Sequence, residues 1–430
     1  MPRLGSLRRP GLRRPNLRRS GRPPVELPRP TGPHPVGRRT YDWVDEARPE
    51  PYARRRREPR RVPVAVWYPA SVTAGGASPY LPEGWGWRLH SALWGVSAGR
   101  VATHAHDGAP PPPGDSRFPI VLFSHAGWAP YFYGALLEEI ASHGYVVVAP
   151  LHVHEVIPTT ELPGGGRRWF RKAAVAGALS VSRRPHVDDV RERGAVVDTK
   201  AADLRFVLDR LAALDAGAVT TSGADPLAGR LDLGRVGVFG HSFGGGAAVV
   251  VCQTDDRVAV GANLDGGLWR EADRAAVDRP FLVVFADHPE FVQPCAEAVA
   301  AKFYSSVEWC EQDRALHLAA WRRLVDSARP GACVQIRGAE HRTFMDWRLL
   351  PLRRWSIGRL GHATIDGARM WAATSRCLLT LFDRHLKGEP SPTFEALAHE
   401  FDELLVASPT ELFTPSGVSD VRTGSSGTTT

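Results

Sequence analysis

The sequence predicts an α/β fold, with a mainly parallel central sheet flanked by helices on both faces. Short apolar segments such as 118–124, 145–150 and 281–286 alternate with segments whose apolar residues recur at helical spacing. Most of the short segments are apolar throughout, which is typical of strands buried on both faces of a parallel sheet. In such a sheet, ligands bind beyond the carboxyl ends of the strands, so polar residues there are the first candidates for function.

The expected elements alternate in a regular order. A helix is expected to begin at Asp198, whose side chain can cap the first turn, and to run to residue 214. A long amphipathic helix over 365–388 ends at Gly388. Further strands are expected at 60–70, 117–124, 145–150, 235–240, 257–265, 279–287 and 331–336, and short helices at 136–142 and 244–252.

These elements form one predicted catalytic domain over residues 31–407. Within it, residues 155–197 are rich in glycine and arginine and match no core element, so they are predicted to form an inserted, lid-like segment. Residues 1–30 are predicted to be a disordered arm rich in arginine and proline, and residues 408–430 a disordered tail.

The net charge of +8 is concentrated in the N-terminal part of the chain. Residues 1–61 contain 18 arginines and 6 acidic residues, a net charge of +12, so the remainder carries −4. The arm is therefore the candidate for contacts with anionic lipid or nucleic acid, and the body is not. No apolar run is long enough to span a bilayer, and no apolar signal-peptide segment follows the twin arginines.

The cysteines have no metal-binding spacing. There are five of them, without a Cys-x-x-Cys pair: Cys252, Cys295, Cys310, Cys333 and Cys377. An odd number of scattered cysteines predicts reduced, mostly buried thiols and a cytoplasmic location.

The clearest chemical signal is the Gly-x-Ser-x-Gly pattern at 240–244, between an expected strand and an expected helix. Ser242 would occupy the sharp turn between them, where side chains on Gly240 or Gly244 would clash with the crossing backbone. The serine hydroxyl would then lie at the helix N-terminus, where the helix dipole favours developing negative charge. Ser242 is therefore a candidate nucleophile.

A serine hydroxyl is a weak nucleophile at neutral pH, so it needs a histidine base and a carboxylate that orients the histidine. Of the 16 histidines, His341 is the best placed, because it follows the strand expected at 331–336. Asp265 and Asp287 each end a strand between Ser242 and His341. Both fit the chain order serine, acid, histidine, so spacing alone leaves the choice of acid open.

Stabilising the oxyanion requires two backbone N–H donors. The first is expected from Phe243, the residue after the candidate nucleophile. The second is expected from the strand-end segment SHAGW, from Gly127 or Ala126. His125 in the same segment is a candidate to hold this loop by hydrogen bonding.

Several segments carry a resemblance to a known family: TGPHPVGRRTYDWVD, FPIVLFSHAGW, GHSFGGGAA, NLDG, GAEHRTFMDW and LFDRHLKG. Together, residues 31–388 resemble the platelet-activating factor acetylhydrolases of the plasma and bacterial type. The resemblance implies a monomeric α/β-hydrolase that needs no metal or organic cofactor. In that family the acid follows the strand directly after the elbow helix, which favours Asp265 over Asp287. The implied roles are Ser242 as nucleophile, Asp265 as acid and His341 as base.

Two segments depart from the family pattern. Ala126 stands where the family usually has a glycine, and Trp128 adds bulk to the same turn. The segment LHVHE at 151–155 replaces a family stretch that resembles Glu-His-Arg-Asp. Both segments adjoin the strand ends, so both bear on substrate choice.

The sequence as a whole predicts a serine carboxylester hydrolase that cleaves short acyl esters through an acyl-enzyme. The sn-2 acetyl group of a platelet-activating-factor-like phospholipid is the candidate substrate implied by the resemblance. One alternative is a related hydrolase acting on polyesters, cutin-like esters or dienelactones. A different class is an inactive hydrolase body that binds nucleic acid or anionic lipid through its basic arm.

Overall fold

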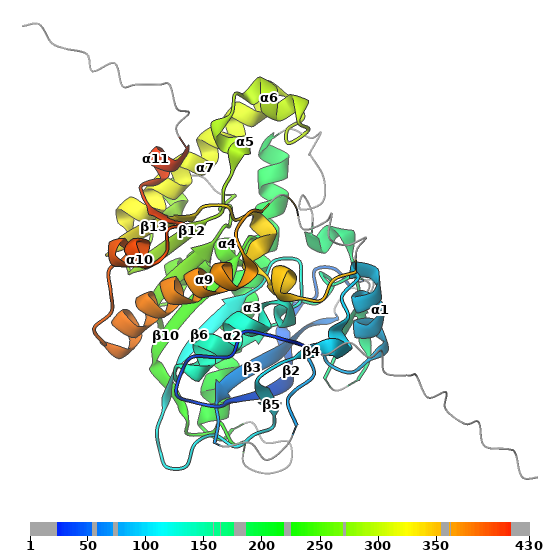
Figure 1. Cartoon of the computed structure of the whole chain (residues 1–430). Coiled ribbons are helices and arrows are strands. Elements are labelled where there is room, and N and C mark those ends of the chain that lie inside the picture. Colours follow the sequence, from blue (N-terminus) through cyan, green and yellow to red (C-terminus); the bar gives the residue numbers. More distant parts are fainter. Residues whose placement is uncertain are drawn as a thin grey trace, which may run out of the picture.

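The central feature of the computed structural model is a ten-stranded, mostly parallel sheet (Figure 1). The structure describes residues 24–53, 58–71, 76–157, 159–163, 165–175, 186–218, 225–269, 272–353, 361 and 363–413. In order across the sheet the strands are β14 (Leu404–Val406), β13 (Gly331–Ile336), β12 (Phe281–Phe285), β11 (Val258–Leu264), β10 (Leu231–His241), β6 (Phe118–Ser124), β7 (Val146–Pro150), β3 (Pro59–Pro69), β2 (Val36–Pro49) and β5 (Ala105–Asp107).

The pairing of these strands confirms the predicted mainly parallel sheet. From β7 through β6, β10, β11 and β12 to β13, every neighbouring pair is parallel. Antiparallel pairing occurs at the margins, where β14 joins β13 and β3 joins both β7 and β2. The carboxyl ends of the central parallel strands therefore meet at one edge, where the candidate site lies.

Helices cover both faces of the sheet, as the apolar strands require. On β6, Val121 and Phe123 pack into the core on one face, and Ile120 and Leu122 pack into the core on the other. The first face is covered by α2 (Gly134–Ser142) and α9 (Gly367–Phe382), and α9 runs in front of the strands in Figure 1. The second is covered by α3 (His186–Asp215), α4 (Phe243–Thr254) and α7 (Val307–Ser327).

Shorter elements complete the described fold. The helices are α1 (Trp85–Trp94), α5 (Pro289–Val292), α6 (Cys295–Ala300), α10 (Phe394–Glu400) and α11 (Pro409–Phe413). The strand pairs are β1 (Val25–Glu26) with β4 (Val101–Ala102), and β8 (Thr159–Glu161) with β9 (Arg167–Trp169). The 3-10 and π turns are η1 (Ala98–Arg100), η2 (Pro130–Tyr133), η3 (Lys172–Val175), η4 (Ala272–Ala275), η5 (His341–Phe344), η6 (Asp346–Leu349) and η7 (Asp383–Lys387).

Helix α3 begins at His186, so the predicted start at Asp198 was wrong. The helix continues toward the N-terminus because Val196 and Val197 are buried in the core beneath it. The predicted insertion 155–197 therefore consists in part of the β8–β9 hairpin and the first turns of α3. Residues 158, 164 and 176–185 of that insertion lie outside the described part of the chain.

The folded chain extends beyond the boundaries expected at residues 31 and 407. β1 pairs in parallel with β4, so residues 24–30, assigned to the arm from sequence, belong to the fold. At the other end, Phe413 of α11 is 5% exposed, and its ring centroid lies 5.1 Å from that of Trp321. The rest of the predicted arm, 1–23, and of the tail, 414–430, lies outside the described residues.

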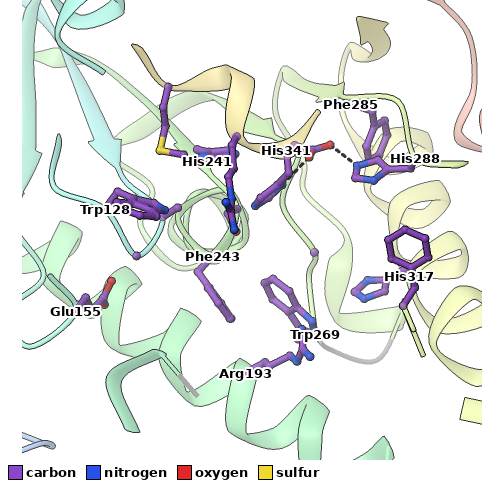
Figure 2. Close-up of a pocket in the computed structure, with 18 of the residues that line it drawn as sticks. Trp128, Glu155, Arg193, His241, Phe243, Trp269, Phe285, His288, His317 and His341 are labelled. Carbon is purple, nitrogen blue, oxygen red and sulfur yellow. Dashed lines mark hydrogen bonds and ion pairs between the residues drawn. The ribbon is translucent and has the colours of Figure 1, made fainter. Parts of the chain in front are cut away.

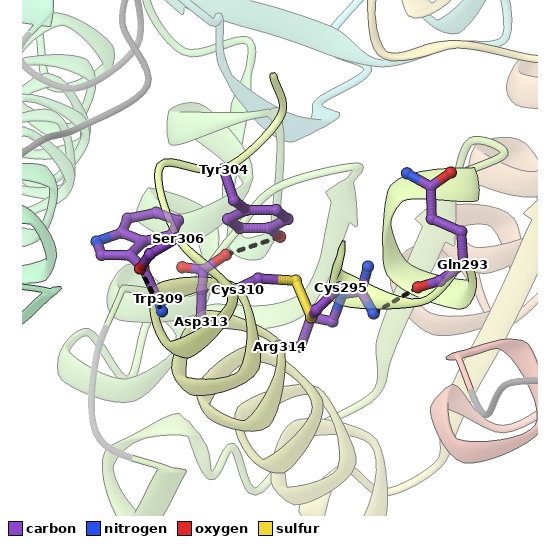
Figure 3. The surroundings of a disulfide bond; sticks show 8 residues. All are labelled: Gln293, Cys295, Tyr304, Ser306, Trp309, Cys310, Asp313 and Arg314. Atoms are coloured by element: carbon purple, nitrogen blue, oxygen red, sulfur yellow. Dashed lines mark hydrogen bonds between the residues drawn. A yellow bond between two sulfur atoms is a disulfide. The ribbon is translucent and has the colours of Figure 1, made fainter. Parts of the chain in front are cut away.

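Two of the five cysteines form a disulfide, so the prediction of reduced thiols was wrong for this pair. Cys295 of α6 is bonded to Cys310 of α7, with 5.9 Å between their Cα atoms (Figure 3). The chain reverses between the two helices, and a separation of 15 residues gave no sign of that approach. The other three thiols are buried, and burial raises the pKa of each to about 12: Cys252, Cys333 and Cys377. The cytoplasmic location stays a prediction, without the support of a fully reduced set.

Within the described ranges, no helix is both long and apolar enough to cross a membrane.

Candidate active site

Ser242 lies in a strained turn between β10 and α4. Its φ of 58° and ψ of −124° are unusual for a residue with a side chain, and such a conformation costs roughly 1–3 kcal/mol. A Cβ added to Gly240 would come within 2.1 Å of the Gly244 carbonyl oxygen, and one on Gly244 within 1.9 Å of the Ser124 carbonyl oxygen. Both neighbouring glycines are therefore required by close backbone approach, as the motif predicts.

Asp265 follows β11 directly and also has a positive φ, of 55°. Its N–H donates to the carbonyl oxygen of Val284 on β12, at 2.7 Å. Its Oδ1 accepts from the N–H of Ala286 at 2.9 Å and from Nε2 of His288 at 2.6 Å, and its Oδ2 accepts from Nδ1 of His341 at 2.6 Å. Burial alone would raise the pKa of Asp265, but the two histidines outweigh burial and hold that pKa well below its usual range.

His341 begins the short helix η5, just beyond β13. Glu340 caps this helix: the Thr343 N–H donates to the Glu340 carbonyl oxygen at 2.8 Å, and the Thr343 hydroxyl accepts from the Glu340 N–H at 3.1 Å. The His341 side chain is 43% exposed, and its ring lies 4.6 Å from the ring of His241. With Nδ1 committed to Asp265, Nε2 is the ring nitrogen that remains for a substrate or nucleophile.

Asp287, the second candidate acid, has a different partner. Its Oδ2 accepts from the N–H of Gly338, and its own N–H donates to the Ala339 carbonyl oxygen at 3.0 Å. Asp287 thus braces the turn that leads into His341, whereas Asp265 contacts the imidazole itself. The structure brings Asp265, and not Asp287, to the histidine.

The loop formed by residues 125–128 lines the same cavity as Asp265 and His341. Ala126, Gly127 and Phe243 all line the same cavity as Ser242. His125 is fully buried; its Nε2 accepts from the N–H of His152 at 3.2 Å, and its Nδ1 donates to the Ala126 carbonyl oxygen. Burial holds the pKa of His125 well below its usual range, so the ring is neutral and fixes the backbone on both sides of it.

A buried charged network, missed from sequence, supports this loop from behind. Lys200 of α3 donates to the His125 carbonyl oxygen at 3.1 Å and to Oε2 of Glu155 at 2.6 Å. Asp203, one turn further along α3, accepts from His152 at 2.9 Å and from two guanidinium nitrogens of Arg60. Burial lowers the pKa of Lys200 and raises that of Glu155 to about 7, despite their ion pair. The segment LHVHE, which departs from the family pattern, thus contributes His152 and Glu155 to this network.

The cavity that holds these groups has a volume of about 450 Å³ (Figure 2). One of its sides is aromatic: the Phe243 ring stacks on Trp269 at 4.4 Å, Trp269 meets His317 edge-on at 5.9 Å, and His317 stacks on Trp321 at 5.2 Å. We call Phe243, Trp269, Phe291, His317 and Trp321 the aromatic wall. It begins at the residue after the candidate nucleophile and extends away from it.

On the side of the 125–128 loop, the bulk of Trp128 is absorbed by other aromatic rings. Its ring lies 4.2 Å from that of Trp94 and 5.1 Å from that of Trp347, both in edge-to-face contact. Trp94 and Trp128 both line the cavity and narrow it on this side. Among the described residues, no group of three or more His, Cys, Asp or Glu side chains is arranged to hold a metal ion.

His288 was also missed from sequence, although it directly follows Asp287. The polar pair Asp287 and His288 at the end of β12 could have indicated a functional position. Of these two residues, His288 lines the cavity and contacts Asp265. Lys200 gave no comparable signal, because it lies in the middle of a helix.

The sheet, the strained serine turn and the histidine–carboxylate pair define an α/β-hydrolase. A model of the family "Platelet-activating factor acetylhydrolase, isoform II" matches residues 21–386, and the chain belongs to this family. Among solved structures, the chain is similar to a ferulic acid esterase from Streptomyces cinnamoneus, with a TM-score of 0.65 and 29% identity over 89% of this chain and 99% of that one.

Similar curated proteins carry related names. A probable 1-alkyl-2-acetylglycerophosphocholine esterase of Arthroderma benhamiae is 33% identical over 165 residues, 37% of this chain and 34% of that protein. A platelet-activating factor acetylhydrolase of Canis lupus familiaris is 25% identical over 241 residues, 53% and 52% of the two chains. These matches span about half or less of the relatives' length.

Proposed function

We propose that this chain is a serine carboxylester hydrolase that cleaves short acyl esters through an acyl-enzyme at Ser242. The observation that carries the proposal is the 2.6 Å hydrogen bond from His341 Nδ1 to Asp265 Oδ2, in a cavity shared with a strained serine. A histidine that donates Nδ1–H to a carboxylate keeps the lone pair on Nε2, which is the tautomer a general base needs.

Each group has one role in the proposed reaction. His341 Nε2 takes the proton of Ser242 as Oγ attacks the ester carbonyl carbon, and the carbonyl π electrons move to oxygen. The N–H groups of Phe243 and Gly127 donate to that oxyanion. Asp265 stays ionised and stabilises the imidazolium that forms. The oxyanion collapses, the alcohol leaves with the proton from His341, and Ser242 carries the acyl group.

Water then repeats the sequence on the acyl-enzyme. His341 takes a proton from the water as its oxygen attacks the acyl carbonyl, and a second oxyanion forms on the same two donors. When that intermediate collapses, Ser242 Oγ leaves, recovers its proton from His341, and the carboxylic acid is released.

Among substrates, we propose the sn-2 acetyl group of a platelet-activating-factor-like phospholipid first. Membership of the family and the names of the two curated relatives support it. The test is a kinetic panel of p-nitrophenyl acetate, butyrate and octanoate beside an sn-2 acetyl phospholipid, each repeated with Ser242→Ala. Serine-dependent cleavage of the phospholipid, with acetyl preferred, supports the proposal; turnover of the simple esters alone would reject the lipid and keep the esterase.

A second candidate is hydrolysis of esters that carry an aromatic acyl group. The aromatic wall favours it, because it offers stacked ring surface from Phe243 outward that an acetyl group is too short to fill. At its far part, His317 is 5% exposed, and its buried Nδ1 has no hydrogen-bond partner among the described residues. Such a nitrogen can pair with a hydroxyl on the ring of a substrate. The similar ferulic acid esterase adds support.

Methyl ferulate and methyl cinnamate separate this candidate from the first, since only the ferulate ring carries a phenolic hydroxyl. If aromatic acyl esters are substrates, ferulate should be preferred by roughly tenfold or more in kcat/KM, the effect of one buried hydrogen bond. His317→Phe should remove the preference and leave p-nitrophenyl acetate turnover within about twofold, because His317 is not one of the groups that react in the proposed mechanism. Absence of turnover on both methyl esters would reject this candidate.

A further inference from the structure

A second histidine contacts the carboxylate of Asp265. His341 occupies Oδ2 and His288 occupies Oδ1, each at 2.6 Å, so the carboxylate lies between two imidazoles (Figure 2). His288 follows β12 by three residues, and Ala286, two residues earlier in the chain, donates its N–H to the same oxygen at 2.9 Å. The mechanism proposed above uses only one of these two histidines.

We propose that His288 is a positioning residue: it fixes the orientation of Asp265 and shares its negative charge with His341. This inference rests on the proposed esterase function. A carboxylate rotates about a broad, roughly two-fold torsion, so one donor does not fix it. Two donors on Oδ1, from Ala286 and His288, leave Oδ2 directed at His341.

The surroundings of His288 hold its ring in place. The side chain is 14% exposed, and Phe291 of α5 meets the ring edge-on at 5.6 Å, with Phe413 of α11 at 6.5 Å. Asp265 is an ionised acceptor, so His288 Nε2 must carry the proton that it shares with the carboxylate. The ring is thus both oriented by packing and fixed in its tautomer.

The charged and titratable groups around His288 define its electrostatic role. Asp265 faces it directly, and His341 binds the other carboxylate oxygen, with the His241 ring tilted against that of His341 at 4.6 Å. From α7, His317 reaches the other side of Phe291 at 6.2 Å. From β12, the neighbouring Asp287 directs its carboxylate to the Gly338 N–H, and α11 contributes the uncharged Phe413.

Two imidazoles share the charge of one carboxylate. A hydrogen bond or a positive charge from His288 draws on the charge of Asp265, which leaves less of it to stabilise a proton on His341. Loss of His288 therefore strengthens proton binding by His341. Since His341 must be neutral to act as base, the acid limb of the kcat/KM profile should move to higher pH in such a variant.

The experiment compares His288→Leu, which has no donor, with His288→Gln, whose Nε2 amide can donate but cannot become charged. On p-nitrophenyl acetate we expect His288→Leu to lose about tenfold or more in kcat, with KM within about threefold, because orientation acts on the chemical step. We expect His288→Gln to recover kcat to within about threefold of wild type. The acid limb should move to higher pH in His288→Leu, and by less in His288→Gln because the amide keeps the hydrogen bond to Asp265; a purely structural role would not move it.

His399→Gln, at an exposed histidine of α10, is the matched control. Melting temperature and a burst titration of active serine show whether each variant is folded. Wild-type kcat and an unmoved acid limb in both folded His288 variants would overturn this inference while Ser242-dependent turnover persists. If wild-type turnover does not depend on Ser242, the proposed function itself fails.

Discussion

The two loops that flank Ser242 are held in place by different interactions. The 125–128 loop is supported by buried ions: Lys200 donates to the His125 carbonyl oxygen, and Glu155, which is 3% exposed, pairs with Lys200. The loop that begins at Asp265 is held by a positive φ, by donors to a single carboxylate and by the stacked rings of the aromatic wall.

Substitutions in the two loops should therefore change different properties of the protein. Removing one partner of a buried ion pair leaves the other charge without compensation, so the free energy of unfolding should fall. Removing a donor or acceptor at Asp265 changes the charge and orientation presented to His341, so the rate should fall while the fold persists. The first loop is coupled to global stability and the second to the chemical step.

The largest effect on kcat is expected in the loop that begins at Asp265, from Asp265→Asn compared with Asp287→Asn. The amide introduced by Asp265→Asn carries no charge to stabilise the imidazolium and would favour the wrong imidazole tautomer, so kcat should fall by roughly 10⁴. Among the described residues, the Asp287 carboxylate accepts a hydrogen bond from backbone and none from a side chain, so Asp287→Asn should stay within about tenfold in kcat. Steady-state kinetics on p-nitrophenyl acetate at pH 7–8 measures both. Equal losses would break the distinction between the two carboxylates.

Behind the 125–128 loop, Lys200→Met should lower the free energy of unfolding more than it lowers kcat. Glu155 would lose its buried partner, and breaking such a pair costs roughly 3–5 kcal/mol in the free energy of unfolding. The double variant Lys200→Met/Glu155→Leu should recover most of that loss, because no unpaired charge remains. Urea denaturation measures all three chains. A Lys200→Met protein as stable as wild type would contradict the role of the network.

The loss in Lys200→Met should also depend on pH. The pKa of Glu155 is raised by burial from 4.5 to about 7, so the folded state binds a proton more tightly than the unfolded state does. Stability from this group is therefore present at low pH and decreases as pH rises through the window from 4.5 to about 7. Without Lys200 the ionised carboxylate is still less favourable, so the variant should lose more stability at pH 8 than at pH 5. Urea midpoints at the two pH values test the sign.

The smallest effect on turnover is expected from Cys295→Ser/Cys310→Ser, which removes the disulfide between α6 and α7. Tyr304 lies between these cysteines in the chain and Trp309 next to Cys310; both line the cavity, and neither is a reacting group of the proposed mechanism. Turnover of p-nitrophenyl acetate should stay within about twofold, while KM for p-nitrophenyl octanoate rises by a few fold. A loss of acetate turnover as large as the octanoate effect would show that the α6–α7 region supports the chemistry itself.

The same contrast separates what the sequence could predict from what it could not. The elbow at 240–244, Asp265 and His341 carry local signals, since each follows an apolar strand and each strand end lies at the same edge of a parallel sheet. The choice between Asp265 and Asp287 came from the family resemblance, because strand-end position fits both. The fold class followed from the alternation of strands and helices.

Long-range contacts gave no such signal. Lys200 and Glu155 are 45 residues apart, and only the packing of α3 on the sheet brings them together. The start of α3 was misplaced because its first turns are charged and arginine-rich, a composition that resembles a loop. The disulfide between Cys295 and Cys310 depends on a chain reversal between two helices, which residue spacing does not encode.

The proposed function depends above all on Ser242 as the nucleophile of an acyl-enzyme. Rapid mixing of the full chain with p-nitrophenyl acetate, followed by acid quench and peptide mass mapping, tests it most directly. We expect a burst of p-nitrophenol of about one per chain and an acetyl group on the peptide that contains Ser242. In Ser242→Ala both should vanish, with kcat lower by about 10⁶. Acetylation of another residue, or a Ser242→Ala enzyme within tenfold of wild type, would contradict the account.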